Sequence, residues 1–272
     1  MLLSLLKFVL VSFALLAVLV YFAQTSLIYF PQSYEYPPER YFRQPLEKLE
    51  FDTSSGRQVS FYMPRGTGMG IPPTVIWVFF NGNAARALDW PQEIADRAPE
   101  GTALLFVDYP GYGLSEGKVS RAAIREVLEK LPEALLKAHP EAKEAFEQRM
   151  GVVGNSIGAA VALELAAKYP AQKIVLIAPF TSMRDMVKTT QYAIFHWLLT
   201  ERFDNTERLK EIFARAERPQ VFIYHGTRDD VIPYSMSKSL KAAFPELVHE
   251  EVANGTHQLL DNVSAKIVSV MK

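Results

Sequence analysis

The sequence contains no cysteine, which excludes disulfides, thiolate metal sites and lipid attachment at a cysteine side chain. It also lacks an excess of positive charge, because 29 Lys and Arg stand against 30 Asp and Glu. Binding to a phosphate backbone depends on a basic surface, so nucleic acid is not expected as a partner. Without a thiol, any side-chain nucleophile must carry oxygen or nitrogen.

Charge is also scarce at the start of the chain. From Leu2 to Ala23 nearly every residue is apolar, and Lys7 is the only charged one. As a helix rising about 1.5 Å per residue, this segment could cross a hydrocarbon core of about 30 Å. We therefore predict a transmembrane anchor over residues 1–24, through which the chain associates with a membrane.

A cleaved signal peptide is the alternative interpretation of this segment. Its apolar region is usually shorter and ends in small residues, whereas this one ends in Val20, Tyr21 and Phe22. Lys7 lies near the N-terminal end of this segment and the next basic residue is Arg40, so the positive-inside rule predicts a cytoplasmic N-terminus. The rest of the chain would then lie on the outer, periplasmic or extracytoplasmic side.

Prolines divide the anchor from the remainder of the chain. Pro31, Pro37, Pro38 and Pro45 each disfavour helix in the residue before them. We therefore expect residues 25–46 to be an extended linker. Residues 47–272 are of a size that one hydrophobic core can serve, and we expect them to form one domain.

The domain alternates between strand-like and helix-like segments. Two antiparallel strands are expected first, over residues 48–53 and 58–63. Further strands are predicted over residues 74–80, 102–108, 150–155, 173–178, 220–225 and 247–252, and helices over residues 86–98, 121–137, 157–168, 234–244 and 259–271. Continuously apolar strands are buried on both faces, so the pattern predicts an α/β fold with a mostly parallel central sheet and helices on both faces. A helical insertion over about 183–216 interrupts the alternation.

The segment Gly154-Asn155-Ser156-Ile157-Gly158 has the form G-x-S-x-G between a predicted buried strand and a helix rich in small residues. In that context the serine lies on a sharp turn that exposes its hydroxyl, and the glycines allow the backbone and the helix to approach closely. A plain strand-to-helix turn is the alternative. Ser156 is the candidate nucleophile.

A second loop follows the strand that ends at Phe80, with the sequence Asn81-Gly82-Asn83-Ala84. A hydrolase sheet needs a backbone N–H at this place, directed at the developing oxyanion. Asn83 is the candidate donor, and its partner is the N–H of Ile157. An ordinary Asn-Gly turn is the alternative interpretation.

The candidate acid and base follow the last two predicted strands. Asp229 and Asp230 come after strand 220–225, and His257 comes after strand 247–252, which completes the chain order Ser, Asp, His. We favour Asp229 as the acid and leave Asp230 open. Imidazole titrates near neutral pH and can accept a proton from Ser156. The other histidines, for which we expect packing or surface roles, are His139, His196, His225 and His249.

With these motifs in place, the chain resembles the membrane-anchored α/β-hydrolase-domain proteins, a serine hydrolase family with one N-terminal span. The resemblance also rests on an HGNA-type oxyanion loop and on the segment Asp108-Tyr109-Pro110-Gly111-Tyr112-Gly113-Leu114-Ser115-Glu116-Gly117. It implies the α/β-hydrolase fold, a short cap within the insertion, and hydrolysis of esters or thioesters of acyl chains. Two residues depart from the family pattern: Asn81 replaces a usual histidine, and Asn155 replaces histidine, arginine or glutamate.

These observations predict a membrane-anchored serine hydrolase that acts on lipid-like or other small-molecule esters through Ser156, His257 and Asp229. Neither metal nor cofactor is expected. The alternatives are a serine peptidase on the same fold and a catalytically silent, membrane-anchored binding protein. Apolar side chains of the insertion either line an acyl pocket or pack between helices; they are Phe195, Trp197, Leu198, Leu199 and Phe203.

Overall fold

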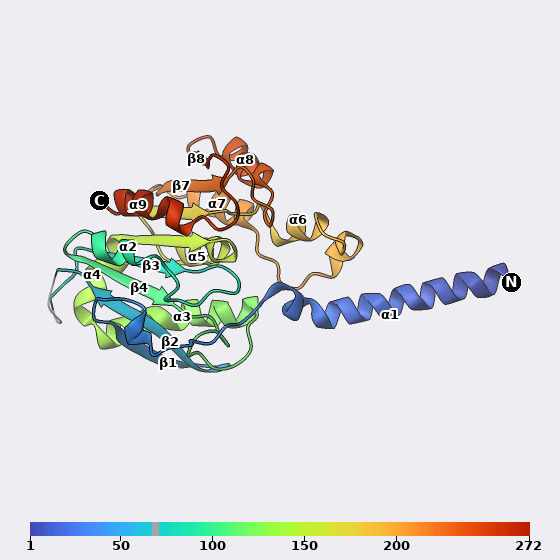
Figure 1. Cartoon of the computed structure of the whole chain (residues 1–272), viewed down its shortest axis with the longest axis horizontal. Coiled ribbons are helices and arrows are strands. Elements are labelled where there is room, and N and C mark those ends of the chain that lie inside the picture. The colour runs from blue at the N-terminus through green and yellow to red at the C-terminus, as the bar shows by residue number, and fades with distance from the viewer. Residues whose placement is uncertain (67–70) are drawn as a thin grey trace.

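A computed structural model describes residues 1–66 and 71–272 of the chain. A long N-terminal helix, α1 (Leu2–Ile28), projects from a domain built around one sheet (Figure 1). By length and composition α1 could cross a membrane, and a signal sequence would meet the same test. The helix runs past the predicted anchor, residues 1–24, and stops at Ile28, so residues 25–28 of the predicted extended linker are helical.

The sheet has eight strands among the described residues: β1 (Glu47–Thr53), β2 (Gly56–Pro64), β3 (Val75–Phe80), β4 (Thr102–Val107), β5 (Met150–Asn155), β6 (Lys173–Ile177), β7 (Gln220–Gly226) and β8 (Val248–Val252). Their order is β1-β2-β4-β3-β5-β6-β7-β8. The pairs β1–β2 and β2–β4 are antiparallel and all other neighbours are parallel. This confirms the predicted α/β fold with a mostly parallel sheet.

The helices of the domain are α2 (Gln92–Arg97), α3 (Arg121–Ala138), α4 (Lys143–Gln148), α5 (Ile157–Lys168), α6 (Met183–Lys188), α7 (Asn205–Phe213), α8 (Tyr234–Ala243) and α9 (Leu260–Met271). Short 3-10 helices are η1 (Pro38–Arg40), η2 (Pro140–Ala142) and η3 (Ala193–Leu198). The sequence pattern did not indicate η2 and α4, because a segment of one or two turns carries little periodicity.

Strand β3 shows why helices cover both faces of the sheet. Ile76, Val78 and Phe80 belong to the core beneath α3 and α5, whereas Trp77 and Phe79 belong to the core beneath α2 and α9. All five side chains are buried. Burial of each such side chain is worth on the order of 1.5–3 kcal/mol, so a strand that is apolar at every position is stable only between two layers of helices.

The helix predicted over residues 86–98 is wrong for its first half, because α2 begins only at Gln92. Pro91 precedes it, and proline disfavours the helical conformation in the residue before it. Upstream, the N–H of Ala87 donates to Asp108 Oδ1 at 2.7 Å. This segment is therefore held as a loop by a bond to a residue distant in the sequence.

Residues 25–46, predicted as a linker, pack closely on the domain. As the prolines indicated, they carry no regular structure after α1 except η1 and an isolated bridge at Ser33. Tyr29 and Phe42 are nevertheless buried in the core. The segment is thus extended but fixed, and it holds the end of α1 against the domain.

The predicted insertion folds into α6, η3 and α7. Ser182 and Asp204 form an antiparallel bridge at its base and also cap α6 and α7, accepting hydrogen bonds from the N–H groups of Asp185 and Glu207. Helix α7 packs into the domain core through Leu209 and Ile212. The protruding part, called the cap below, is therefore residues 183–204, and it lies beside the end of α1 (Figure 1).

Candidate active site

Ser156 occupies the sharp turn between β5 and α5. Its backbone has φ 56° and ψ −120°, which is a strained conformation for a residue with a side chain. The two flanking glycines make this turn possible. A Cβ on Gly154 would lie 2.2 Å from the carbonyl oxygen of Gly158, and a Cβ on Gly158 would lie 2.2 Å from that of Phe80.

The structure brings the hydroxyl, the imidazole and one carboxylate into a chain of hydrogen bonds. Ser156 Oγ donates to His257 Nε2 at 3.1 Å, and His257 Nδ1 donates to Asp229 Oδ2 at 2.8 Å. One neutral tautomer, with hydrogen on Nδ1, satisfies both bonds. The three residues follow β5, β7 and β8, whose carboxyl ends share one edge of the sheet.

The carboxylate that reaches His257 belongs to Asp229, whereas Asp230 is exposed. Asp229 Oδ1 also accepts the backbone N–H groups of Val231 at 2.9 Å and Ile232 at 2.8 Å. Its side chain is completely buried. The loop after β7 therefore directs the first of the two adjacent aspartates inward and fixes both of its oxygens.

His225 is a site residue for which we had expected only a packing role. Its side chain is buried, and Nε2 lies 3.2 Å from Asp229 Oδ2 and 3.0 Å from the carbonyl oxygen of Ile232. Burial alone would raise the pKa of Asp229, but hydrogen bonds from His225, His257 and the Ile232 N–H lower that pKa well below its ordinary value. The one sequence signal for His225 was its place near the end of β7, four residues before Asp229.

The loop after β3 lies directly beside Ser156. A Cβ on Gly82 would be 3.4 Å from Ser156 Cβ. Within residues 1–66 and 71–272, the backbone N–H groups of Asn83 and Ile157 donate to no protein acceptor. Asn83, Ile157 and Ser156 line the same pocket, so both N–H groups remain candidate donors to an oxyanion there.

Asn81 braces this loop, although it replaces the histidine usual in the family that the chain resembles. Its Oδ1 accepts the N–H of Gly82 at 2.8 Å, and its Nδ2 donates to the carbonyl oxygen of Arg86 at 3.0 Å. Tyr109 OH donates to the Asn81 carbonyl oxygen at 2.8 Å. The amide thus supplies one acceptor and one donor where both are needed.

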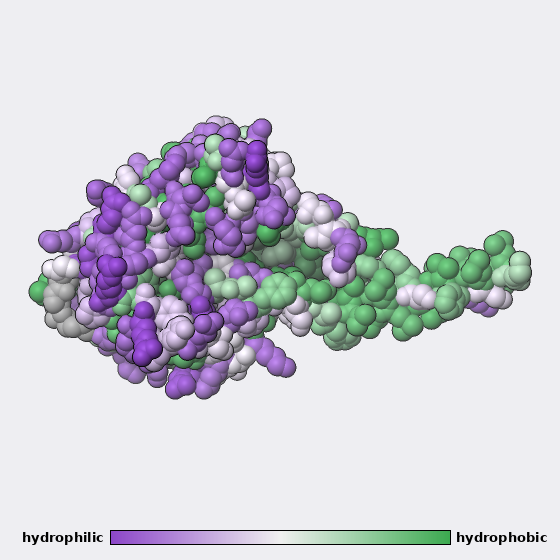
Figure 2. Space-filling model, in the orientation of Figure 1, coloured by the Kyte–Doolittle hydropathy of each residue, from purple (hydrophilic) through white to green (hydrophobic). Residues whose placement is uncertain are grey.

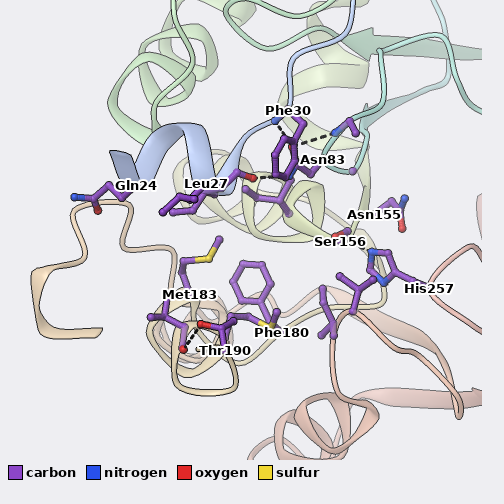
Figure 3. Close-up of a pocket in the computed structure, with 18 of the residues that line it drawn as sticks. Gln24, Leu27, Phe30, Asn83, Asn155, Ser156, Phe180, Met183, Thr190 and His257 are labelled. Carbon is purple, nitrogen blue, oxygen red and sulfur yellow. Dashed lines mark hydrogen bonds between the residues drawn. The ribbon is translucent and has the colours of Figure 1, made fainter. Parts of the chain in front are cut away.

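The side chain of Asn83 ties the same loop to the chain that leaves α1. Its Oδ1 accepts the N–H of Phe30 at 2.9 Å and the hydroxyl of Tyr112 at 2.8 Å. Its Nδ2 donates to the carbonyl oxygen of Ile28, and Figure 3 shows Asn83 hydrogen-bonded beside Phe30. The candidate oxyanion donor is therefore positioned by the N-terminal segment.

A pocket of about 850 Å³ extends from Ser156 and His257 beneath the cap. Its lining is mainly apolar and comes from the cap, from the loop after β3 and from α1. Figure 3 shows Ser156 and His257 at one end of the view, Leu27 of α1 across from Met183 of the cap, and Gln24 at the other end. No group of three His, Asp or Glu side chains in the described part of the chain is placed to hold a metal ion.

The apolar side chains of the insertion divide between the two roles considered for them. Phe195, Leu198 and Leu199 line the pocket. Phe203 is buried in the core of the domain and does not reach the pocket. Trp197 does neither, since it is exposed and absent from the pocket lining.

Known proteins resemble the chain in sequence and in fold. An uncharacterized protein of Mycobacterium tuberculosis is 28% identical over 249 residues, which cover 88% of this chain and 83% of that protein. An esterase of Pyrococcus furiosus aligns with a TM-score of 0.63 at 15% identity, covering 89% of this chain and 95% of its own. The thioesterase domain from the curacin biosynthetic pathway aligns with a TM-score of 0.58 at 12% identity, covering 84% and 99%. At such low identity the two structures show the fold alone.

The match to a family model is more specific than these likenesses of fold. The model describes the alpha/beta hydrolase family, and it matches residues 77–236. That range runs from β3 through the turn at Ser156 and the cap to the start of α8. Because it spans more than half of the sequence, the chain belongs to the alpha/beta hydrolase family.

Proposed function

We propose that the protein is a membrane-anchored serine hydrolase that cleaves carboxylic esters or thioesters of apolar acyl chains. The observation that carries the proposal is the hydrogen-bonded chain Ser156–His257–Asp229 at one end of a large apolar pocket. A hydroxyl that donates to an imidazole, itself oriented by a buried carboxylate, is the arrangement that activates serine as a nucleophile.

The reaction we propose begins with attack of Ser156 Oγ on the carbonyl carbon of the substrate. His257 Nε2 accepts the hydroxyl proton and returns it to the departing alcohol or thiol, which leaves an acyl group on Ser156. The negative oxygen of each tetrahedral intermediate binds the N–H groups of Asn83 and Ile157. Water, deprotonated by His257, then releases the acid and restores the enzyme.

Asp229 keeps His257 in the required tautomer and stabilises the imidazolium that forms in each step. Its lowered pKa means that it remains a carboxylate at neutral and mildly acidic pH. The negative charge is therefore present whenever the imidazole becomes positive.

An acyl substrate is favoured by the lining of the pocket. Side chains such as Leu27, Met183 and Phe195 make much of the lining apolar, and the polar side chains of Asn155 and His257 lie beside Ser156 (Figure 3). Such a division suits a substrate with one reactive polar group and a hydrocarbon chain. The likeness in fold to an esterase and to a thioesterase domain supports both ester classes without separating them.

We further propose that α1 is a retained anchor with its N-terminus in the cytoplasm and the domain on the outer side. Lys7 supports this direction through the positive-inside rule. An anchored enzyme meets membrane-resident esters at a high effective concentration.

Ser156→Ala tests the proposed reaction in the full chain, purified in detergent. Wild-type protein is expected to take up a fluorophosphonate label and to hydrolyse p-nitrophenyl esters. The variant should lose the label and fall to background, a loss on the order of a million-fold for a serine nucleophile. Undiminished ester hydrolysis by Ser156→Ala would contradict the assignment.

The same samples separate the alternative functions. A serine peptidase would cleave peptide amides in preference to esters. A catalytically silent binding protein would fold, as judged by circular dichroism, but take up no label and cleave neither class.

A further inference from the structure

The last turns of α1 form part of the pocket that contains Ser156. Val20, Gln24, Leu27 and Ile28 all line it, together with the cap and the site residues. From Val20 to Ile28 the helix rises about 12 Å at about 1.5 Å per residue. The pocket therefore follows α1 back into the predicted membrane span over residues 1–24.

The cap packs along the same helix. The rings of Phe13 and Phe195 stack with centroids 5.3 Å apart, and Gln24 Oε1 accepts the N–H of Thr200 at 2.7 Å. Gln24 is buried, although α1 is otherwise mostly exposed. A buried amide in an apolar helix requires a fixed partner, and here the partner is the cap.

The outer surface of the cap is apolar where it adjoins α1. Ile194 and Trp197 of η3 are 61% and 55% exposed. Figure 2 shows apolar side chains continuing from α1 onto the adjoining part of the domain. If α1 lies in a bilayer, the stacking of Phe195 on Phe13 places this surface against the acyl region of the outer leaflet.

We propose that α1 and the cap together form the wall of an acyl-binding pocket that opens into the bilayer. The acyl chain of a membrane-resident ester passes between α1 and the cap and reaches Ser156 without crossing water. This inference rests on the proposed function and adds the source of the substrate and a specificity role for α1. The hydrogen bonds between Asn83 and the backbone of Ile28 and Phe30 hold the end of α1 at a fixed position relative to the reacting groups.

Val20→Trp tests the wall, with Leu19→Trp as its matched control. Val20 lines the pocket, whereas the neighbouring Leu19 is outside it and 64% exposed. A larger ring at Val20 shortens the space for an acyl chain. We expect the ratio of kcat/KM for a palmitoyl ester to kcat/KM for an acetyl ester to fall about tenfold or more in Val20→Trp. Leu19→Trp should leave both constants at their wild-type values.

Fluorophosphonate labelling of each variant shows whether the reacting groups are intact. A labelled Val20→Trp protein with an unchanged ratio, or an equal fall in both variants, would overturn the role of α1 and leave the proposed function standing. Wild-type protein that is neither labelled nor active on any ester would overturn both.

A second experiment tests whether the substrate enters the pocket from the bilayer. The full chain is reconstituted in phosphatidylcholine vesicles, and the palmitoyl ester is placed either in the same vesicles or in separate ones. Hydrolysis is expected to be faster when enzyme and ester share a bilayer, while an acetyl ester in solution is cleaved equally in both arrangements. Equal rates for the palmitoyl ester would show access from water and would contradict the proposal.

Discussion

At the residue scale, the charge and direction of a few side chains decide the chemistry of the site. Asp229 is the clearest case. It is adjacent to a second aspartate, yet it alone is buried, bonded to His257 and held by two backbone N–H groups. A spacing rule indicates that a carboxylate follows β7, but two adjacent carboxylates satisfy such a rule equally. The hydrogen bonds of the loop distinguish them.

Asp229→Asn is expected to lower kcat for ester hydrolysis by about four orders of magnitude. The amide preserves the shape of the side chain but removes the charge and favours the wrong imidazole tautomer. Because the pKa of Asp229 lies well below its ordinary value, the wild-type group is charged at mildly acidic pH, and the deficit should persist there. Rates are measured on a p-nitrophenyl ester across that pH range.

Asp230→Asn is the matched control. The side chain of Asp230 is exposed and makes no hydrogen bond in the described part of the chain, so kcat should remain within about twofold of wild type. Equal losses in the two variants would mean that the choice between the aspartates is wrong.

At the element scale, the end of α1 and the polypeptide that leaves it connect two parts of the site. They hold the loop after β3 through Asn83 and the cap through Gln24 and Tyr29. Tyr29 OH donates to Glu201 Oε2 at 2.6 Å, and the same oxygen accepts the N–H of Arg121 at 2.5 Å. Glu201 is buried, so each of these donors offsets the cost of keeping a carboxylate out of water.

Tyr29→Phe removes one donor from that buried carboxylate and leaves the ring in place. We expect the free energy of unfolding to fall by about 1–3 kcal/mol, as when a hydrogen bond to a charged group is lost. Urea denaturation of the detergent-solubilised chain measures the change.

Tyr36→Phe serves for comparison, because Tyr36 is exposed and its hydroxyl has no hydrogen-bond partner within residues 1–66 and 71–272. Its free energy of unfolding should match wild type within about 0.5 kcal/mol. If Tyr29→Phe is equally silent, the contact with Glu201 contributes nothing to holding α1.

At the scale of the whole molecule, α1 is bound to the domain as well as extending from it. Its end contributes to the pocket, its buried amide binds the cap, and Tyr29 lies in the core directly after it. A cleaved leader has no need of such contacts, since it is absent from the folded product. The contacts therefore favour an anchor that remains attached.

Intact α1 is accordingly expected in the mature protein. Mass spectrometry of the protein extracted from membranes should detect peptides covering residues 1–28, in the wild type and in Ser156→Ala alike. A mature form that begins after Ala23 and fractionates away from membranes would show that the helix is a signal sequence.

Much of this protein could be predicted from local patterns in the sequence. Apolar runs separated by helical periodicity predicted the order of strands and helices, because burial on one or both faces leaves a period that a short window contains. The motif around Ser156 and the chain order Ser, Asp, His likewise indicated which side chains meet at one edge of the sheet. Each of these features depends on residues that are close in the sequence or on a fixed topology.

Only the tertiary structure decided the contacts between distant segments. It placed His225 against Asp229, held the first half of the helix predicted over residues 86–98 as a loop through the bond from Ala87 to Asp108, and made α1 a wall of the pocket. The hydrogen bond from Tyr29 to Glu201 joins residues 172 positions apart, and a local sequence pattern does not predict a contact between such distant residues. The sequence by itself determined the strands of the sheet, most of its helices and where the reacting groups follow them. How the N-terminal helix meets those groups was decided by the packing of side chains that only the folded chain brings into contact.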